Sequence, residues 1–194
     1  MTVREALHEM EAEGIIERRR GIFGGSFVSQ PGAEKIEQAL NNYHLFTGLT
    51  PEELVEFRTI LEPELVVLAI ERRIQKDLEA MKQNIIEVEA AINKGKPDQA
   101  KGIHFHFLIA EACHNRWISL IMGALVKIFL DVLSKVPMTI EDARGDLEYN
   151  RQFYDFMLKR RKKEARQLMI KHFGTLSAII ERNKKEKIIN VHDQ

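Results

Sequence analysis

The sequence contains very little cysteine: Cys113 is the only one among 194 residues. A single cysteine cannot form an internal disulfide, which excludes the small secreted domains that disulfides hold together. Cys113 lies in an apolar stretch, so a buried small hydrophobe is favoured over a nucleophile. The chain also opens without a secretory signal and has no uninterrupted run of about 18 apolar residues. We therefore expect a cytoplasmic protein with no membrane partner.

A net charge is absent as well, because 29 Lys and Arg residues balance 29 Asp and Glu residues. Any nucleic-acid binding must come from a local basic surface rather than from the whole chain. The length and the 44% hydrophobic content suffice for one sizeable core, or for a small domain followed by a larger one. No nucleophile with an adjacent base, no carboxylate pair and no phosphate-binding loop is recognisable, so we predict that the protein is not an enzyme.

The first thirty residues combine a helical pattern with a hairpin pattern. Residues 2–13 have one narrow apolar face at helical spacing, and Gly14 ends that pattern. Two β-prone runs, residues 15–17 and 26–28, flank three arginines and a glycine-rich tip, which predicts a β-hairpin. This order is typical of a winged helix-turn-helix, whose helix enters the DNA major groove while the hairpin contacts the backbone or the minor groove. A solvated basic loop is the alternative.

The rest of the chain has helical periodicity nearly throughout. The turn signal Gln30-Pro31-Gly32 marks a linker, which we place at residues 31–35. Thr50-Pro51-Glu52-Glu53 is a capping box, and Asn115 is a second candidate helix cap. Helices are expected over residues 36–46, from 51 past 68, over 77–93, 103–115 and 117–132, from 139 past 156, and over 163–182.

The predicted fold class is therefore mainly α. A partial winged helix-turn-helix over residues 1–30 precedes an all-α bundle of six to seven helices over residues 36–188. Residues 103–115 are apolar on nearly every side of a helix, which is typical of a buried helix. His106 within it then needs a hydrogen-bond partner, a metal or a ligand. A core histidine bonded to a neighbouring carbonyl group is the plainer interpretation.

Three segments near the start carry a family resemblance: residues 2–7 (Thr-Val-Arg-Glu-Ala-Leu), residues 11–19 and residues 24–28 (Gly-Gly-Ser-Phe-Val). They resemble the recognition helix and the wing of GntR-family bacterial transcription regulators. In that family two further helices come first, so the resemblance implies that this chain begins inside the DNA-binding domain. It also implies that Thr2 and Arg4 face DNA and that Gly24 and Gly25 let the wing approach the backbone. With Arg18, Arg19 and Arg20, these are the candidate DNA-binding residues.

The helical part resembles the FCD effector domain of the FadR subfamily. The matching residues are 56–63 (Glu-Phe-Arg-Thr-Ile-Leu-Glu-Pro), Phe105-His106 with residues 109–112 and Asn115, Tyr154-Asp155, and His172. The resemblance implies a ligand-responsive regulator that binds operator DNA as a homodimer and takes a small organic acid as its effector. The alternative is a helical protein that binds a small molecule or a metal, a metalloenzyme included, with no role at DNA.

The FCD family usually places an aspartate and three histidines around a divalent metal. In this sequence Gly102 stands at the aspartate position and Asn150 at the second histidine position, which leaves His106 and His172. Two imidazoles and a neutral amide fall short of the three or four good ligands of a zinc or nickel site. His104 is no substitute, because side chains two residues apart on a helix point in different directions. We predict no required cofactor.

The resemblance also places Arg58 on a helix that lines the same cavity. A guanidinium group there would hold an organic acid through two parallel hydrogen bonds, and protonated histidines would favour the same anion. A surface pair between Arg58 and Glu62, four residues apart, is the alternative. We therefore expect a cavity bounded by Arg58, His106, Asn150 and His172, with extra space beside Gly102. It should bind a small organic acid with little or no dependence on a transition metal.

The recognition-helix assignment makes a prediction about Arg4. In a gel shift of the full-length gene product on its own upstream DNA, Arg4→Ala should weaken binding by about 1–3 kcal/mol if the guanidinium contacts a base edge. Substitutions at residues 18–20 should instead flatten the salt dependence, because they act through phosphate contacts. Unchanged binding by Arg4→Ala would contradict the assignment of residues 2–13 as the recognition helix.

Overall fold

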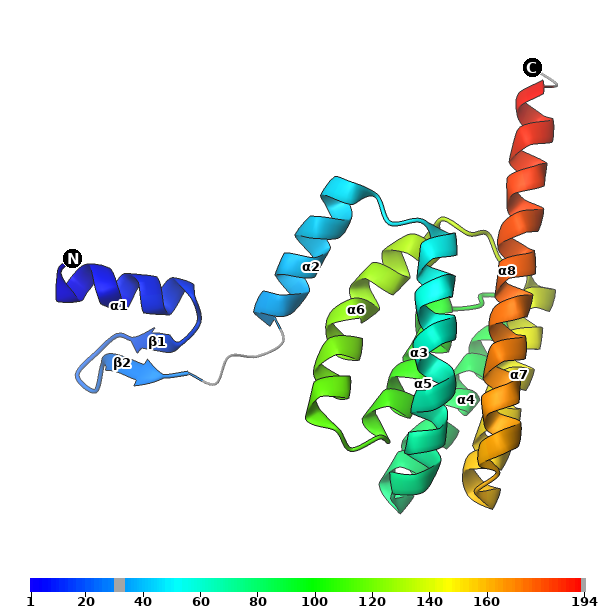
Figure 1. The fold of residues 1–194 in the computed structure, drawn as a ribbon, viewed down its shortest axis with the longest axis horizontal. Helices are drawn as coiled ribbons and strands as arrows, with labels where there is room; N and C mark the ends of the chain where they lie inside the picture. The colour runs from blue at the N-terminus through cyan, green and yellow to red at the C-terminus, as the bar shows by residue number, and fades with distance from the viewer. Residues whose placement is uncertain (30–33, 193–194) are drawn as a thin grey trace.

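The computed structural model describes residues 1–29 and 34–192, with side chains through residue 185. These residues form eight helices and one two-stranded antiparallel hairpin (Figure 1). The hairpin and the first helix lie at the N-terminal end, and the other seven helices form the bundle. The prediction of a mainly α protein, a helix and hairpin followed by an all-α bundle, is confirmed.

The N-terminal helix α1, Val3–Ala12, begins where the sequence predicted. Thr2 caps it, and Glu5 completes the capping box by accepting from the Thr2 backbone N–H at 2.7 Å. Strand β1, Ile16–Arg19, pairs with strand β2, Gly25–Val28, so that Arg19 lies opposite Gly25. At the hairpin tip a Cβ on Gly24 would lie 2.6 Å from the Arg19 carbonyl oxygen, so only glycine fits this turn.

The seven remaining helices follow in chain order. They are α2 (Glu34–Thr47), α3 (Pro51–Arg72), α4 (Gln75–Asn93), α5 (Gln99–Glu111), α6 (Arg116–Ser134), α7 (Ile140–Lys159) and α8 (Lys162–His192). Thr50 caps α3 through the predicted box, and the Asn115 side chain accepts from the backbone N–H groups of Trp117 and Ile118 to cap α6. Both predicted caps are confirmed.

Several predicted boundaries differ from the observed ones, and α5 begins at Gln99 rather than at residue 103. Helix α5 ends at Glu111 rather than at residue 115, because His114 adopts a left-handed backbone conformation and Asn115 turns to cap α6. Helix α2 begins at Glu34, so the predicted linker overlaps it by two residues, and Gln30 to Gly32 lie outside the described residues. Helix α8 continues past residue 182, and Lys184 forms an ion pair with Glu52 at 2.7 Å.

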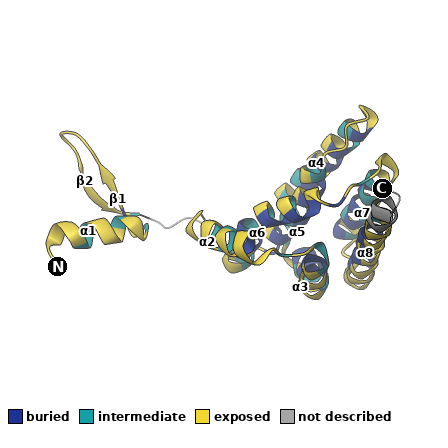
Figure 2. Ribbon diagram, turned by 90° about the horizontal axis from the view of Figure 1, so that it is seen from above, coloured by how far each residue is buried: buried dark blue, intermediate teal, exposed yellow. Residues whose placement is uncertain are grey.

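The core lies between the helices of the bundle. Helix α3 packs along α8, α5 along α6, and α4 along both α5 and α7. Figure 2 shows the buried residues on the faces that these helices turn toward one another, whereas α1 and the hairpin are mostly exposed. Cys113 is fully buried, and burial raises the pKa of its thiol to about 12. The prediction of a buried cysteine is confirmed.

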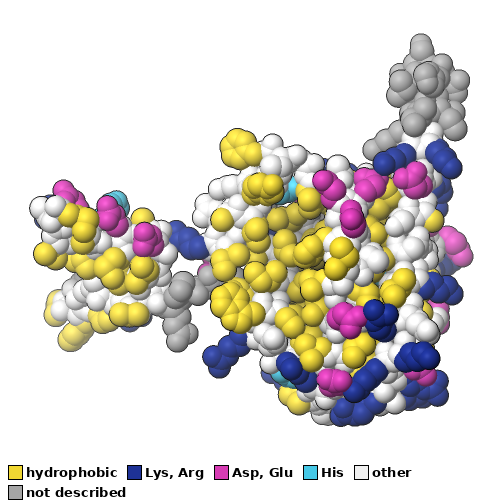
Figure 3. All heavy atoms as spheres, in the orientation of Figure 1, with side chains coloured by type: hydrophobic (Ala, Val, Ile, Leu, Met, Phe, Trp, Pro, Cys, Tyr) yellow, Lys and Arg dark blue, Asp and Glu magenta, His cyan; other side chains and the backbone are white. Residues whose placement is uncertain are grey.

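One broad apolar face of the bundle remains exposed. Figure 3 shows hydrophobic side chains gathered over α2, α3 and α6. The exposed residues on these helices include Tyr43, Leu45, Phe46, Phe57, Ile60, Trp117 and Ile121. Helix α6 is also long and apolar enough to cross a membrane, a criterion that core helices of globular proteins meet too. An apolar patch of this kind on a protein surface is typical of an interaction site.

Candidate functional site

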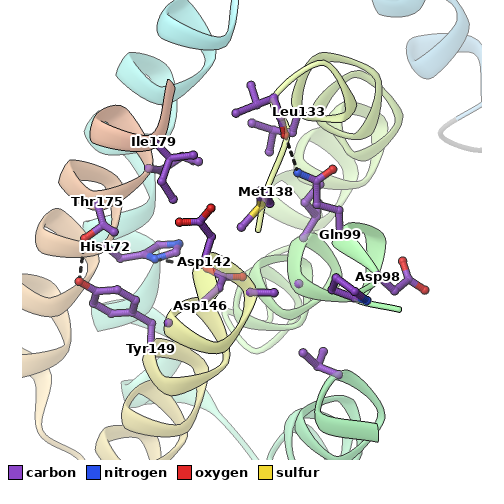
Figure 4. Close-up of a pocket in the computed structure, with 18 of the residues that line it drawn as sticks. Asp98, Gln99, Leu133, Met138, Asp142, Asp146, Tyr149, His172, Thr175 and Ile179 are labelled. Atoms are coloured by element: carbon purple, nitrogen blue, oxygen red, sulfur yellow. Dashed lines mark hydrogen bonds and ion pairs between the residues drawn. The ribbon is translucent and has the colours of Figure 1, made fainter. Parts of the chain in front are cut away.

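A cavity of about 380 Å³ opens inside the bundle, between the chain around α5 and the end of α6 on one side and α7 and α8 on the other (Figure 4). Hydrophobic side chains such as Ile92, Leu133 and Ile179 form part of its wall. The polar residues that line it are Arg58, Asp98, Gln99, His106, Ser134, Glu141, Asp142, Asp146, Tyr149, His172 and Thr175. A largely pre-formed cavity of this size is typical of a small-molecule site.

Arg58 reaches this cavity from α3 and is 2% exposed. Its Nε donates to Glu62 Oε1 at 2.5 Å, and its guanidinium lies 5.2 Å from the Phe129 ring centroid and 4.8 Å from that of Phe173. Its Nη2 is buried and has no hydrogen-bond partner among the described residues. The Arg58 and Glu62 pair therefore exists, but it is buried rather than on the surface, and it leaves one nitrogen of the guanidinium group without a partner among the described residues.

Glu62 connects Arg58 to His106. The second carboxylate oxygen of Glu62, Oε2, lies 2.5 Å from His106 Nδ1, which donates to it. Burial alone would raise the pKa of Glu62, but the charges of Arg58 and His106 outweigh that effect and lower it to about 2. The partner of His106 is thus a carboxylate on a neighbouring helix, not the backbone carbonyl of the plainer interpretation.

His172 stacks on His106, with ring centroids 5.1 Å apart and planes 21° from parallel. The Tyr149 ring lies 4.9 Å from that of His172, and the Tyr149 hydroxyl group is 2.9 Å from Thr175 Oγ1. Burial lowers the pKa of His172 well below its ordinary value of 6.5, and the charges of His106 and Arg58 add to this effect. His172 is therefore neutral at neutral pH, which corrects the expectation that its protonation favours an anion.

Asp146 of α7 occupies the space beside Gly102. A Cβ at residue 102 would lie 2.9 Å from Asp146 Oδ2, so the absence of a side chain there makes room for this carboxylate. Asp146 Oδ1 lies 3.6 Å from His172 Nδ1, and Figure 4 shows the two side chains together in the cavity. Burial raises the pKa of Asp146, and the charges of His106 and Arg58 offset part of that shift. The expectation of extra space beside Gly102 was wrong, because the Asp146 carboxylate fills it.

Asn150 does not line the cavity in this arrangement. It is fully buried on α7, one helical turn beyond Asp146, and neither its side-chain nitrogen nor its oxygen has a hydrogen-bond partner among the described residues. Arg58, His106 and His172 do line the cavity, together with Gly102. The structure thus brings three of the four expected residues to its wall and keeps Asn150 behind it.

These donors do not fit a resident zinc or nickel ion. Asn150 offers only a neutral amide, and His106 has Nε2 alone left for a metal ion, because its Nδ1 binds Glu62. Within residues 1–29 and 34–185 no group of three His, Cys, Asp or Glu side chains is placed to share a metal ion. Metal sites in proteins use three or four such ligands, so the chemistry of this cavity is that of hydrogen bonds and charge.

The candidate DNA-binding residues lie on α1 and the hairpin. Arg4, Arg18, Arg19 and Arg20 are all exposed. Arg18 lies 3.7 Å from Glu11, while Arg19 pairs with Glu17 and lies over the Phe27 ring at 4.9 Å. The sequence did not predict these acidic partners, Glu11 for Arg18 and Glu17 for Arg19. The hairpin tip also presents Ile22 and Phe23, which are almost fully exposed and were not among the predicted DNA-binding residues.

Comparison with known proteins gives a family match over most of the bundle. The FCD domain model matches residues 53–175. The HTH-type transcriptional regulator LutR of Bacillus subtilis is 27% identical over 131 residues, which cover 68% of this chain and 59% of that protein. The Uxu operon transcriptional regulator of Escherichia coli is 30% identical over 115 residues, which cover 58% of this chain and 44% of that protein. The chain thus spans about half the length of these curated relatives.

Solved structures give the same fold. A GntR protein of Streptococcus agalactiae superposes with a TM-score of 0.66 at 19% identity, covering 89% of this chain and 78% of that one. E. coli McbR/YncC superposes with a TM-score of 0.57 at 17% identity, covering 93% and 84%. At these identities the likeness concerns the fold alone.

The buried position of Glu62 predicts a pH-dependent stability. Because its folded pKa is about 2 and its ordinary value is 4.5, its stabilising effect is complete above pH 4.5 and is lost as the pH falls toward 2. Glu62→Gln should lower the free energy of unfolding at pH 7 by about 3–5 kcal/mol, measured by urea denaturation, because Arg58 loses its buried partner. The difference from the wild type should shrink between pH 4.5 and 2.

The control is Glu89→Gln, which removes a half-exposed partner of Arg151. It should cost no more than about 1 kcal/mol at either pH, since exposed ion pairs contribute little. A Glu62→Gln chain as stable as the control at pH 7 would show that the buried pair does not stabilise the fold.

Proposed function

We propose that this protein is a ligand-responsive bacterial regulator, because the chain belongs to the FCD-domain family of GntR-type transcription regulators. In this proposal it binds operator DNA as a homodimer, and its effector is a small organic acid. It is a regulator and not an enzyme, in agreement with the sequence prediction, since the relatives it matches are named as regulators of transcription. The cytoplasm, where DNA is accessible, is the proposed location.

One observation carries the effector proposal: Arg58 lines a cavity of about 380 Å³, and its buried Nη2 has no hydrogen-bond partner among the described residues. An unpaired buried donor costs free energy, and an acceptor brought by a ligand recovers it. A carboxylate is the acceptor that a guanidinium binds best. His106 and His172 would supply further polar contacts, and Asn150 would join them if the ligand displaced the side chains in front of it.

The DNA proposal rests on α1 and the hairpin. Helix α1 has no buried residue, and Arg4 extends from it without a partner among the described residues. Thr2, Gly24 and Gly25, with Arg18 to Arg20, would contact the backbone of the duplex. One recognition helix reads only a few base pairs, so a two-fold dimer on a pseudo-palindromic operator doubles the site.

The dimer proposal rests on the exposed apolar face of α2, α3 and α6. Tyr43, Leu45 and Phe46 are each more than half exposed, although they are large and hydrophobic. A self-complementary patch of this kind is what a two-fold interface requires. Burying it against a second copy would remove several large apolar side chains from water.

The effector proposal predicts that linear monocarboxylates bind to the chain in a way that depends on Arg58. Arg58→Lys keeps the charge but loses the forked donors, so affinity measured by isothermal titration should fall by about tenfold or more. The control Arg166→Lys changes an exposed arginine that pairs with Glu64, and its affinity should equal that of the wild type. Equal binding by both variants would contradict the assigned role of Arg58.

The dimer proposal predicts a two-fold mass in light scattering at micromolar concentration. Phe46→Glu places a charge on the apolar face of α2, where the phenylalanine is 92% exposed, and should shift the protein to monomer. Ile86→Glu, on α4 and 50% exposed, is the matched control and should leave the dimer intact. A monomeric wild type would refute the proposal.

A further inference from the structure

The carboxylates that line the cavity favour an acid that also carries a positive charge over a simple anion. Four carboxylates line it, from Asp98, Glu141, Asp142 and Asp146, against a single arginine, Arg58. The charge of Arg58 is already balanced by the buried carboxylate of Glu62. These carboxylates therefore disfavour an acid that brings no compensating positive charge, relative to an acid that does.

Three of the four carboxylates have donors of their own. Asp142 accepts from Arg182 Nη1 at 3.1 Å and from Nη2 at 2.6 Å. Asp98 caps α5 by accepting from the Ala100 backbone N–H at 3.0 Å. Glu141 is mostly exposed to solvent and lies 3.6 Å from Arg144. None of these three groups needs a ligand.

Asp146 is different, because no hydrogen-bond donor contacts it within the described residues. The nearest polar group is His172 Nδ1 at 3.6 Å, which is beyond hydrogen-bond distance, and that imidazole is neutral. The carboxylate is about one-quarter exposed, and the missing side chain of Gly102 gives it room within the cavity. A carboxylate held this way binds a donor that the cavity itself does not provide.

A cationic donor fits this position better than a hydroxyl group does. Tyr149 follows Asp146 by three residues on α7, so its ring lies on the same side of the helix, and it too lines the cavity. An ammonium group between the two would pair with the carboxylate and lie near an aromatic face, which attracts cations. A hydroxyl group would satisfy one oxygen but leave the excess negative charge unbalanced.

We propose that the effector is an amino-substituted organic acid, whose carboxylate group binds Arg58 and whose ammonium group binds Asp146. This inference rests on the proposed function and names the class of acid that the cavity selects. Such a zwitterion has no net charge, so it enters the acidic cavity without repulsion. It also supplies partners to the two groups of the cavity wall that lack them, Nη2 of Arg58 and the carboxylate of Asp146.

The test is isothermal titration of the purified chain with matched linear acids. Each set shares one carbon skeleton of three to six carbons and carries hydrogen, hydroxyl or amino at carbon two or at the chain end. The amino member of at least one set should bind at least about tenfold more tightly than its unsubstituted partner. Asp146→Asn, which keeps the shape and removes the charge, should abolish that preference.

Two further variants keep the test independent of folding defects. Gly102→Ala retains the charge of Asp146 but places a methyl group 2.9 Å from its Oδ2, so it should reduce the preference as well. Glu148→Gln removes an exposed carboxylate of the same helix that does not line the cavity, and it should leave the preference unchanged. Circular dichroism of each variant confirms that it is folded.

The outcomes separate this inference from the function on which it rests. If acids bind in an Arg58-dependent way but amino members bind no better than hydroxyl or unsubstituted members, the role of Asp146 is wrong and the organic-acid effector stands. If the preference for amino members remains in Asp146→Asn, the role of Asp146 is likewise wrong and the organic-acid effector still stands. If no member of any set binds, both the inference and the organic-acid effector are overturned.

Discussion

The buried ion pair of Arg58 and Glu62 is the interaction on which the cavity depends. Charges removed from water are tolerated only when they are paired and hydrogen-bonded, and here one carboxylate serves two partners on different helices. Glu62 holds Arg58 between two phenylalanine rings and also fixes His106, whose ring then stacks on His172 of α8. One turn of α3 thereby contacts both α5 and α8 and leaves one buried nitrogen of Arg58 without a hydrogen-bond partner among the described residues.

The fold was largely predictable because its signals are local. The capping box at Thr50, the Asn115 cap and the hairpin around Gly24 depend on residues within a few positions of one another. The boundaries that were missed depend on more than periodicity. Helix α5 ends before the predicted residue because His114 adopts a left-handed backbone conformation. Helix α8 continues beyond residue 182, where Lys184 forms an ion pair with Glu52 of α3.

The site was predictable only in part. Arg58, His106 and His172 came from a family resemblance, and all three line the cavity. Asp146 was missed because its role depends on a vacancy at Gly102 on another helix, which no spacing along the chain reveals. The sequence did contain one indication that Asp146 lies near the site. Asp146 precedes Asn150, a predicted site residue, by four residues and lies on the same side of α7. The burial of Glu62 could not be predicted from the sequence either. A spacing of four residues between Arg58 and Glu62 is compatible with an exposed ion pair and with a buried one.

The most direct test of this account is a double-mutant cycle on the buried pair, with Arg58→Met, Glu62→Met and the double variant compared by urea denaturation. If the pair organises the site, each single variant leaves an unpaired buried charge, and the double variant is more stable than the sum of the two losses predicts, by about 2–3 kcal/mol. Losses that add within about 0.5 kcal/mol would show that the two residues act independently and would contradict the account.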